Sequence, residues 1–270
     1  MPTNVSEIAR TTLVPHWVTA GLTAIGLVAA IYASATGAGV PILAKVSMIA
    51  WLTLSVGLTL WVTPRNFTAG FLTGLGAMLV GWRIAGLDGV DLVAWALLPA
   101  FIAFVVQFFD CARINLGSIG IVGWQLTFIR IYIGFDMVPH FTEKLFAGPT
   151  SFDGDLQDFS GFGLPLPSAW VVIAGFCELG TAIGIGLGLL TRLAGVCAAL
   201  YFFIATVIGG HFFNGFIWAS TGGGWEYPVL MMVLFLSYAT TGAGPFSLDR
   251  VLRERGLIPD FAARFATSRW

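Results

Sequence analysis

Two residues of opposite charge, Arg130 and Glu178, lie inside long apolar stretches of the sequence. On helices that begin at Ser118 and Pro167, they would lie about 18 Å and about 16 Å from those starts. An ionised side chain at mid-membrane depth costs at least about 2.5–3.5 kcal/mol, so it needs a partner or a function. We therefore predict an Arg130–Glu178 pair, which fixes helix packing, relays charge or protons, or forms the wall of a polar pocket.

A second polar group lies where three apolar stretches end. His211 and Glu226 flank one loop, and both can exchange protons, because His titrates near neutrality and partial burial raises the pKa of a Glu. We predict a pocket at this end, since convergent polar groups in an apolar setting are typical of ligand sites. The predicted catalytic residues are Arg130, Glu178, His211 and Glu226, and the predicted binding residues are His140, Lys144, Asn214 and Trp225.

The sequence lacks the motifs that are typical of metal sites, bound redox cofactors and disulfides. His140, His211 and Glu226 have side chains that suit zinc or iron, but no two of them share a helix at ligand spacing, so we predict no metal. We find no haem, flavin or iron–sulfur motif and expect no covalent cofactor. Cys177 and Cys197 should differ in depth by about 12 Å, which is too far for a disulfide.

The composition places these residues in a membrane. The 270 residues are 57% hydrophobic and only 10% charged, against about 25% charged in soluble domains. A net charge of −1 excludes a nucleic-acid binder. Because a spanning helix needs about 20 apolar residues, we predict an all-α polytopic membrane protein with about eight spans. They are Leu13–Ser34, Ala44–Val62, Phe67–Ile84, Val90–Phe109, Ser118–Pro139, Pro167–Leu190, Leu193–Phe213 and Tyr227–Thr241.

The Lys and Arg residues predict the orientation. With a cytoplasmic N-terminus, nine of them lie inside and three outside, as the positive-inside rule requires. We therefore expect an inner-membrane protein with both termini in the cytoplasm. Glu7 and Arg10 precede a full-length apolar stretch, so we expect an anchor rather than a cleaved signal peptide. The inner set is Arg10, Arg65, Arg113, Arg192, Arg250, Arg253, Arg255, Arg264 and Arg269, and the outer set is Lys45, Arg83 and Lys144.

Four spans precede Ser118 and four follow it, which suggests two four-helix halves related by duplication. We predict domains at residues 1–117 and 118–245, and a tail at 246–270 that is either an amphipathic cytoplasmic segment or a solvated one. Ser247 can cap a short helix in this tail. Gly180, Gly184 and Gly188 form a stripe of small residues, which favours close helix packing or a dimer interface.

The second half resembles the DoxX/DoxD family of four-helix membrane proteins. The resemblance rests on a series of short motifs spread over residues 118–250. They are Arg130 with Gly134, then His140, Lys144, Phe146-Ala147-Gly148-Pro149, Glu178-Leu179-Gly180, Gly188-Leu189-Leu190-Thr191-Arg192-Leu193-Ala194, His211, Trp225-Glu226-Tyr227-Pro228 and Gly242-Ala243-Gly244-Pro245-Phe246-Ser247-Leu248-Asp249.

The resemblance implies a membrane subunit of a quinone-linked oxidoreductase. DoxD-type proteins pass electrons from thiosulfate to quinone, so a quinone and other membrane or periplasmic subunits are the expected partners besides the lipid bilayer. A thiosulfate anion would be drawn to Arg130, His140 and Lys144. Two alternatives stay open: a non-catalytic scaffold or assembly subunit of a larger membrane complex, and a transporter of small molecules or lipids.

Overall fold

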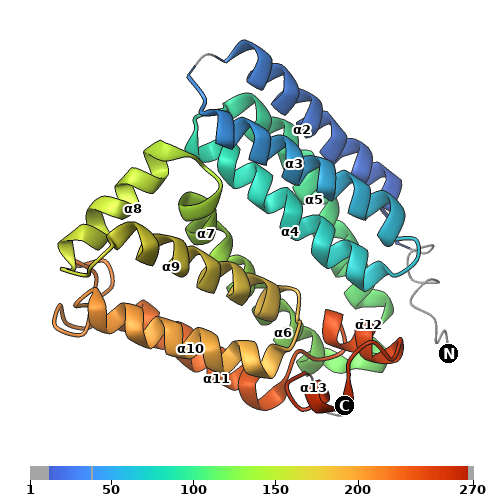
Figure 1. The fold of residues 1–270 in the computed structure, drawn as a ribbon. Helices are drawn as coiled ribbons and strands as arrows, with labels where there is room; N and C mark the ends of the chain where they lie inside the picture. The colour runs from blue at the N-terminus through green and yellow to red at the C-terminus, as the bar shows by residue number, and fades with distance from the viewer. Residues whose placement is uncertain (1–11, 38, 267–270) are drawn as a thin grey trace. The chain divides into compact units, whose positions relative to one another are not determined.

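The computed structural model describes residues 12–37 and 39–266 (Figure 1). Over these residues the chain forms helices and turns and contains no strand, which confirms the predicted all-α membrane fold. Seven helical segments within them are long and apolar enough to cross a membrane. They are His16–Thr36, Ile42–Val62, Phe67–Leu87, Asp91–Ile114, Leu116–Leu145, Pro167–Gly186 and Thr191–Ile208.

The eighth predicted span is a helix, but a short one. Helix α11 (Glu226–Thr241) has 16 residues, which at 1.5 Å per residue gives about 24 Å. The hydrocarbon core of a bilayer is about 30 Å thick. The long connection between the fifth and sixth spans also contains a helix, α8 (Pro149–Gly161).

The chain divides into two compact units. The first contains the residues up to Leu126 together with Val138–Gly154, and the second contains Thr127–Met137 and the residues from Asp155 onward. The division therefore falls inside helix α6 (Leu116–Phe135), nine residues after the domain boundary predicted at 117/118. Helix α7 (Met137–Leu145) follows α6 directly, and its residues from Val138 onward belong to the first unit.

The first unit is a bundle of four helices among the described residues: α2 (His16–Thr36), α3 (Ile42–Gly57), α4 (Phe67–Leu87) and α5 (Asp91–Ile114). Helix α2 packs on α3 and α5, and α4 packs on α3 and α5. Phe71 lies at the centre of an aromatic cluster, with ring centroids 5.6 Å from Phe104 and 6.0 Å from Phe108. Aromatic packing therefore forms part of the core of this bundle.

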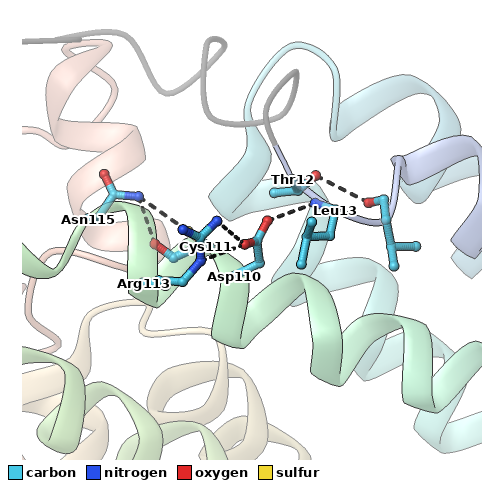
Figure 2. A network of polar contacts seen from close by, with 7 residues as sticks. Thr12, Leu13, Asp110, Cys111, Arg113 and Asn115 are labelled. Atoms are coloured by element: carbon cyan, nitrogen blue, oxygen red, sulfur yellow. Dashed lines mark hydrogen bonds and ion pairs between the residues drawn. The ribbon is translucent and has the colours of Figure 1, made fainter.

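A buried carboxylate fixes one end of this bundle (Figure 2). Asp110 Oδ2 accepts a hydrogen bond of 2.7 Å from the backbone N–H of Leu13, just before α2. Its Oδ1 accepts from Arg113 Nη2 at 2.7 Å, and Gln107 Nε2 donates to the carbonyl of Val14 at 2.9 Å. The chain that enters α2 therefore finds its polar partners on α5, where water is scarce.

The second unit contains the end of α6, α9 (Pro167–Thr181), α10 (Thr191–Ile208) and α11. Helices α10 and α11 pack closely because Gly195 lacks a side chain: a Cβ there would lie 2.5 Å from the carbonyl oxygen of Phe235. Helix α6 approaches the end of the sixth span equally closely, since a Cβ on Gly134 would lie 2.1 Å from the backbone nitrogen of Gly186.

A π-helical turn ends the second span of each unit. The turns are η1 (Leu58–Val62), which continues α3, and η2 (Ala182–Gly186), which continues α9. Their starting residues are 124 positions apart, and so are Phe67 and Thr191, which begin the next helices. This common spacing favours the duplication that the sequence suggests.

The described part of the C-terminal tail belongs to the second unit and packs within it. Phe246, Ser247 and Asp249 are buried, and Ser247 caps α12 (Leu248–Glu254) as expected, accepting a hydrogen bond from Arg250 N–H. Farther along, beyond α13 (Asp260–Ala263), the carbonyl of Phe265 accepts from the backbone N–H of Arg192. The first residues of the tail are thus buried within the protein, while the choice between an interfacial and a solvated remainder stays a prediction. Of the predicted features, Glu7, Arg10 and Arg269 lie outside the described residues.

Gly134→Ala should destabilise the protein, whereas Gly180→Ala should not. The added methyl at Gly134 meets the backbone of Gly186, but nothing lies within 4 Å of a Cβ at Gly180. Overpacking of this kind typically costs about 1–3 kcal/mol. Thermal unfolding of both variants in detergent measures the difference. An equal midpoint for the two would show that the close approach of α6 to η2 carries no stability.

Candidate functional site

Arg130 lies at the centre of a polar junction in the second unit. Its side chain on α6 is 0% exposed. Nη1 donates to the carbonyl oxygens of Ile185 and Gly186 at 2.6 and 2.7 Å, and Nη2 donates to the carbonyl of Phe246 at 2.6 Å. The final carbonyls of a helix lack partners within the helix, so the end of η2 offers acceptors to the guanidinium.

Asp249, which carries the opposite charge, binds the neighbouring backbone on the other side of this junction. Its carboxylate accepts from the backbone N–H groups of Leu190 and Thr191 at 2.6 and 3.1 Å, which are free because α10 begins there. Burial raises the pKa of Asp249 above its ordinary value, while these N–H donors and Arg130 act in the opposite direction. We call Arg130, Asp249 and the backbone that they bind the Arg130 junction.

Gly188 allows the parts of the junction to meet. Its φ of 74° is left-handed, and a Cβ would lie 2.7 Å from the Cβ of Ser247 and 2.9 Å from Arg130 Nη1. Its carbonyl also accepts a hydrogen bond from Asp249 N–H. The Arg130 junction therefore brings together three of the motifs that carry the family resemblance, those around Arg130, Gly188 and Ser247.

The predicted Arg130–Glu178 pair is wrong. Both residues are described, and no hydrogen bond or ion pair joins them. Glu178 Oε1 instead accepts a hydrogen bond of 2.7 Å from the hydroxyl of Tyr201 on α10. Similar depth is not sufficient for pairing, because main-chain carbonyls at the end of η2 already bind the guanidinium.

Glu178 and Tyr201 form one of two carboxylate–phenol pairs in the second unit. Glu178 is 5% exposed. In the other pair, the hydroxyl of Tyr227 at the start of α11 donates to Asp136 Oδ2 at the end of α6. Tyr227 also lies within electrostatic range of Glu178. The unit therefore holds two carboxylates with attached hydroxyl groups, which is an arrangement suited to exchanging protons.

A cavity of about 310 Å³ lies between α9 and α10, beside the Glu178–Tyr201 pair. Tyr201 lines it, together with both Cys177 and Cys197. Both thiols are free. The other lining residues are Gly180, Thr181, Ile183, Gly184, Leu189, Leu190, Leu193, Ala194 and Ala198.

The site residues predicted at the outer end of the second unit form contacts within the connection between α10 and α11. His211 Nδ1 lies 3.0 Å from the carbonyl oxygens of Gly222 and Gly223, so it carries the proton and donates. Asn214 Nδ2 donates to the same two carbonyls. Glu226 Oε2 accepts from the backbone N–H of Trp218 at 3.1 Å. Trp225 packs edge-on against Phe216, 4.7 Å between centroids.

His140 and Lys144 lie on α7 in the first unit. Lys144 Nζ donates to the carbonyl of His140 at 3.2 Å, and Lys144 also lines a separate cavity of about 550 Å³ with residues of α3 and α8. Beside Lys144 on the same helix, Glu143 forms an ion pair with Arg83. The predicted pocket shared by His140, His211 and Glu226 stays a prediction.

Sequence analysis missed Tyr201 and Asp136. Tyr201 is one of only five tyrosines and lies in the middle of an apolar stretch, so it could have been noticed as a polar group at mid-membrane depth. Asp136 lies near the end of the predicted span Ser118–Pro139, where an acidic residue is not unusual. Over the described residues, no group of three His, Cys, Asp or Glu side chains could hold a metal ion.

Arg130→Met and Glu178→Gln should lower stability independently. Removing the guanidinium leaves buried carbonyls without donors, at about 1–3 kcal/mol for each group. Because the two residues share no contact, the free energies of unfolding lost by the single variants should add to within about 0.5 kcal/mol in the double variant. Denaturant unfolding in mixed micelles measures all three. A coupling clearly above that limit would restore the direct pair.

Known proteins are similar to this chain in a stretch that lies mostly in the second unit. The sequence model of the DoxX family matches residues 125–211. The inner membrane protein YphA of Escherichia coli (strain K12) is 36% identical over 107 residues, which cover 37% of this chain and 72% of YphA. No solved structure matches the chain. The matched stretch holds Arg130, Glu178 and Tyr201. The chain thus belongs to the DoxX family of integral membrane proteins.

Proposed function

We propose that this protein is the membrane-embedded subunit of a quinone-linked oxidoreductase, similar to the thiosulfate:quinone type. The observation that carries the proposal is the Glu178–Tyr201 hydrogen bond beside the cavity between α9 and α10. Both helices belong to segments that can span a membrane. A lipophilic ligand can therefore reach the cavity from the bilayer, where quinones reside.

The cavity suits the head group of a quinone. Its volume of about 310 Å³ lies at the lower end of the range of about 300–1,000 Å³ for small-molecule sites. Reduction of a quinone to a quinol consumes two electrons and two protons. Once Glu178 is protonated it can donate to the phenol oxygen, which leaves the Tyr201 hydroxyl hydrogen free to bond a quinone oxygen. Glu178 then returns one proton to the phenol when Tyr201 gives its own to the quinone, and the second proton has to come from another group. The electrons would come from a partner subunit, because the sequence carries no haem, flavin or iron–sulfur motif.

The contacts change which residues we assign to proton transfer. We assign it to Glu178 with Tyr201, with Asp136 and Tyr227 as a second pair. His211 and Glu226 already use their polar atoms on loop backbone. The guanidinium of Arg130 is fully buried and binds three carbonyls, so an anion such as thiosulfate would have to bind elsewhere, on this chain or on a partner.

A scaffold role is the second candidate. The Arg130 junction favours it, because the buried arginine and Asp249 both bind main-chain groups and hold the tail to the turn before α10. A subunit that only positions partners would need such a junction and would not need the Glu178–Tyr201 pair. The two roles therefore differ in what they demand of that pair.

Tyr201→Phe should weaken quinone binding, whereas Tyr132→Phe should not. Both tyrosines lie in the second unit, but Tyr132 is exposed on α6 and does not line the cavity. A hydrogen bond lost at about 1.4 kcal/mol corresponds to a tenfold weaker Kd. Photolabelling of the purified protein by an azidoquinone, in competition with a short-chain quinone, measures the Kd.

Glu178→Gln should retain quinone binding better than Tyr201→Phe, because its amide N–H can donate to the phenol oxygen and leave the Tyr201 hydroxyl hydrogen for the quinone. It should nevertheless abolish quinone-coupled turnover in the assembled complex, since an amide cannot carry the proton. Equal labelling of Tyr201→Phe and wild type, with full turnover in Glu178→Gln, would reject the quinone role and favour the scaffold.

A further inference from the structure

The loop between α10 and α11, residues 209–225, is unusual in its composition. It contains no Asp, Glu, Lys or Arg in 17 residues. Eleven consecutive residues, 212–222, are exposed. They include Phe213, which is 88% exposed, as well as Phe216, Ile217 and Trp218. A loop in water rarely presents so many large apolar side chains together without a partner.

Part of the loop backbone is paired within the protein. The N–H groups of Gly224, Trp225 and Glu226 donate to the carbonyls of residues 217, 215 and 216. The N–H groups of residues 211, 213, 214, 220 and 223 also donate to nearby carbonyls. Irregular backbone at membrane depth is tolerated only when its polar groups are paired within the protein.

The polar side chains of the loop serve the same purpose. His211 and Asn214 donate to the carbonyls of Gly222 and Gly223, and Glu226 accepts from Trp218 N–H. These side chains point back to the backbone while the apolar side chains face outward. This is the reverse of a loop built for water.

Glycine makes such a compact loop feasible. A Cβ on Gly224 would lie 2.5–2.6 Å from three carbonyl oxygens, those of residues 215, 216 and 217. Gly215, Gly222 and Gly223 have φ values of 83°, 82° and 68°, which other residues rarely adopt. The chain therefore folds tightly here, with Gly224 directly against the carbonyls of residues 215–217.

The flanking helices place the loop at the membrane boundary. Helix α11 supplies about 24 Å of apolar length and α10, with 18 residues, about 27 Å. Helix α11 falls short of the hydrocarbon thickness of about 30 Å, and α10 is near the minimum length that can span it. The loop begins where α10 ends and stops where α11 begins, so its apolar residues can supply the missing depth.

We propose that residues 209–225 insert into the membrane interface and bind lipid through Phe213, Phe216 and Ile217. The partner of this exposed surface is the bilayer itself rather than a soluble subunit. Trp218 and Trp225 belong to the same inserted structure, since tryptophan favours the head-group level. This inference does not depend on the quinone-linked function.

Spin-label accessibility tests the proposal on the full chain. The three native cysteines, Cys111, Cys177 and Cys197, are first replaced by alanine, and a nitroxide is then attached at Phe213→Cys or Ile217→Cys. Asp158→Cys, on the polar and exposed helix α8, is the matched control. The proteins are reconstituted in vesicles of phosphatidylethanolamine and phosphatidylglycerol, and relaxation by oxygen is compared with relaxation by a water-soluble nickel chelate.

We expect the oxygen-to-nickel ratio to be several-fold higher at residues 213 and 217 than at residue 158, because oxygen concentrates in lipid and the chelate does not. Two independent label sites keep the test valid if one variant folds poorly, and thermal unfolding identifies such a variant. Labels at 213 and 217 that relax like the label at 158 would show that the loop lies in water, which overturns the proposal and leaves its apolar face to a soluble partner.

Discussion

Main-chain groups released from helices inside a membrane need partners, and this constraint explains most of the polar architecture described. The π-helical turn η2 and the start of α10 expose carbonyl and N–H groups at one place. Arg130 supplies donors for the carbonyls, and Asp249 supplies acceptors for the N–H groups. In the first unit, Asp110 does the same for the chain entering α2. At these three residues, charge serves to satisfy the backbone.

That use of charge explains what the sequence could and could not predict. The spans follow from apolar length, and the structure confirms seven of them by length and composition. The pairing of Arg130 failed because the prediction considered only charged side chains as partners. Every residue carries a carbonyl, so sequence cannot show which carbonyls a turn will release. The π-helical turn, which releases them here, has no strong sequence signal.

The same reasoning applies to the candidate site. Glu178 was predicted from its depth alone, since a carboxyl group in an apolar stretch is readily noticed. Its partner Tyr201 was missed because an amphipathic tyrosine in a membrane is ordinarily assigned to an interface. His211 and Asn214 were placed in a pocket by their chemistry, although their contacts are with glycine carbonyls that pattern analysis cannot locate.

The common spacing of the two π-helical turns has an evolutionary consequence. At the same offset of 124 residues, Glu178 corresponds to Leu54 and Tyr201 to Ala77. If the halves descend from one ancestral bundle, the first has kept the helix-ending turn while its carboxylate and phenol positions are now apolar. Selection has then acted separately on the helical architecture and on the polar side chains. Two separate ancestral bundles would each have carried a carboxylate–phenol site, whereas this fused chain carries that site in its second half only.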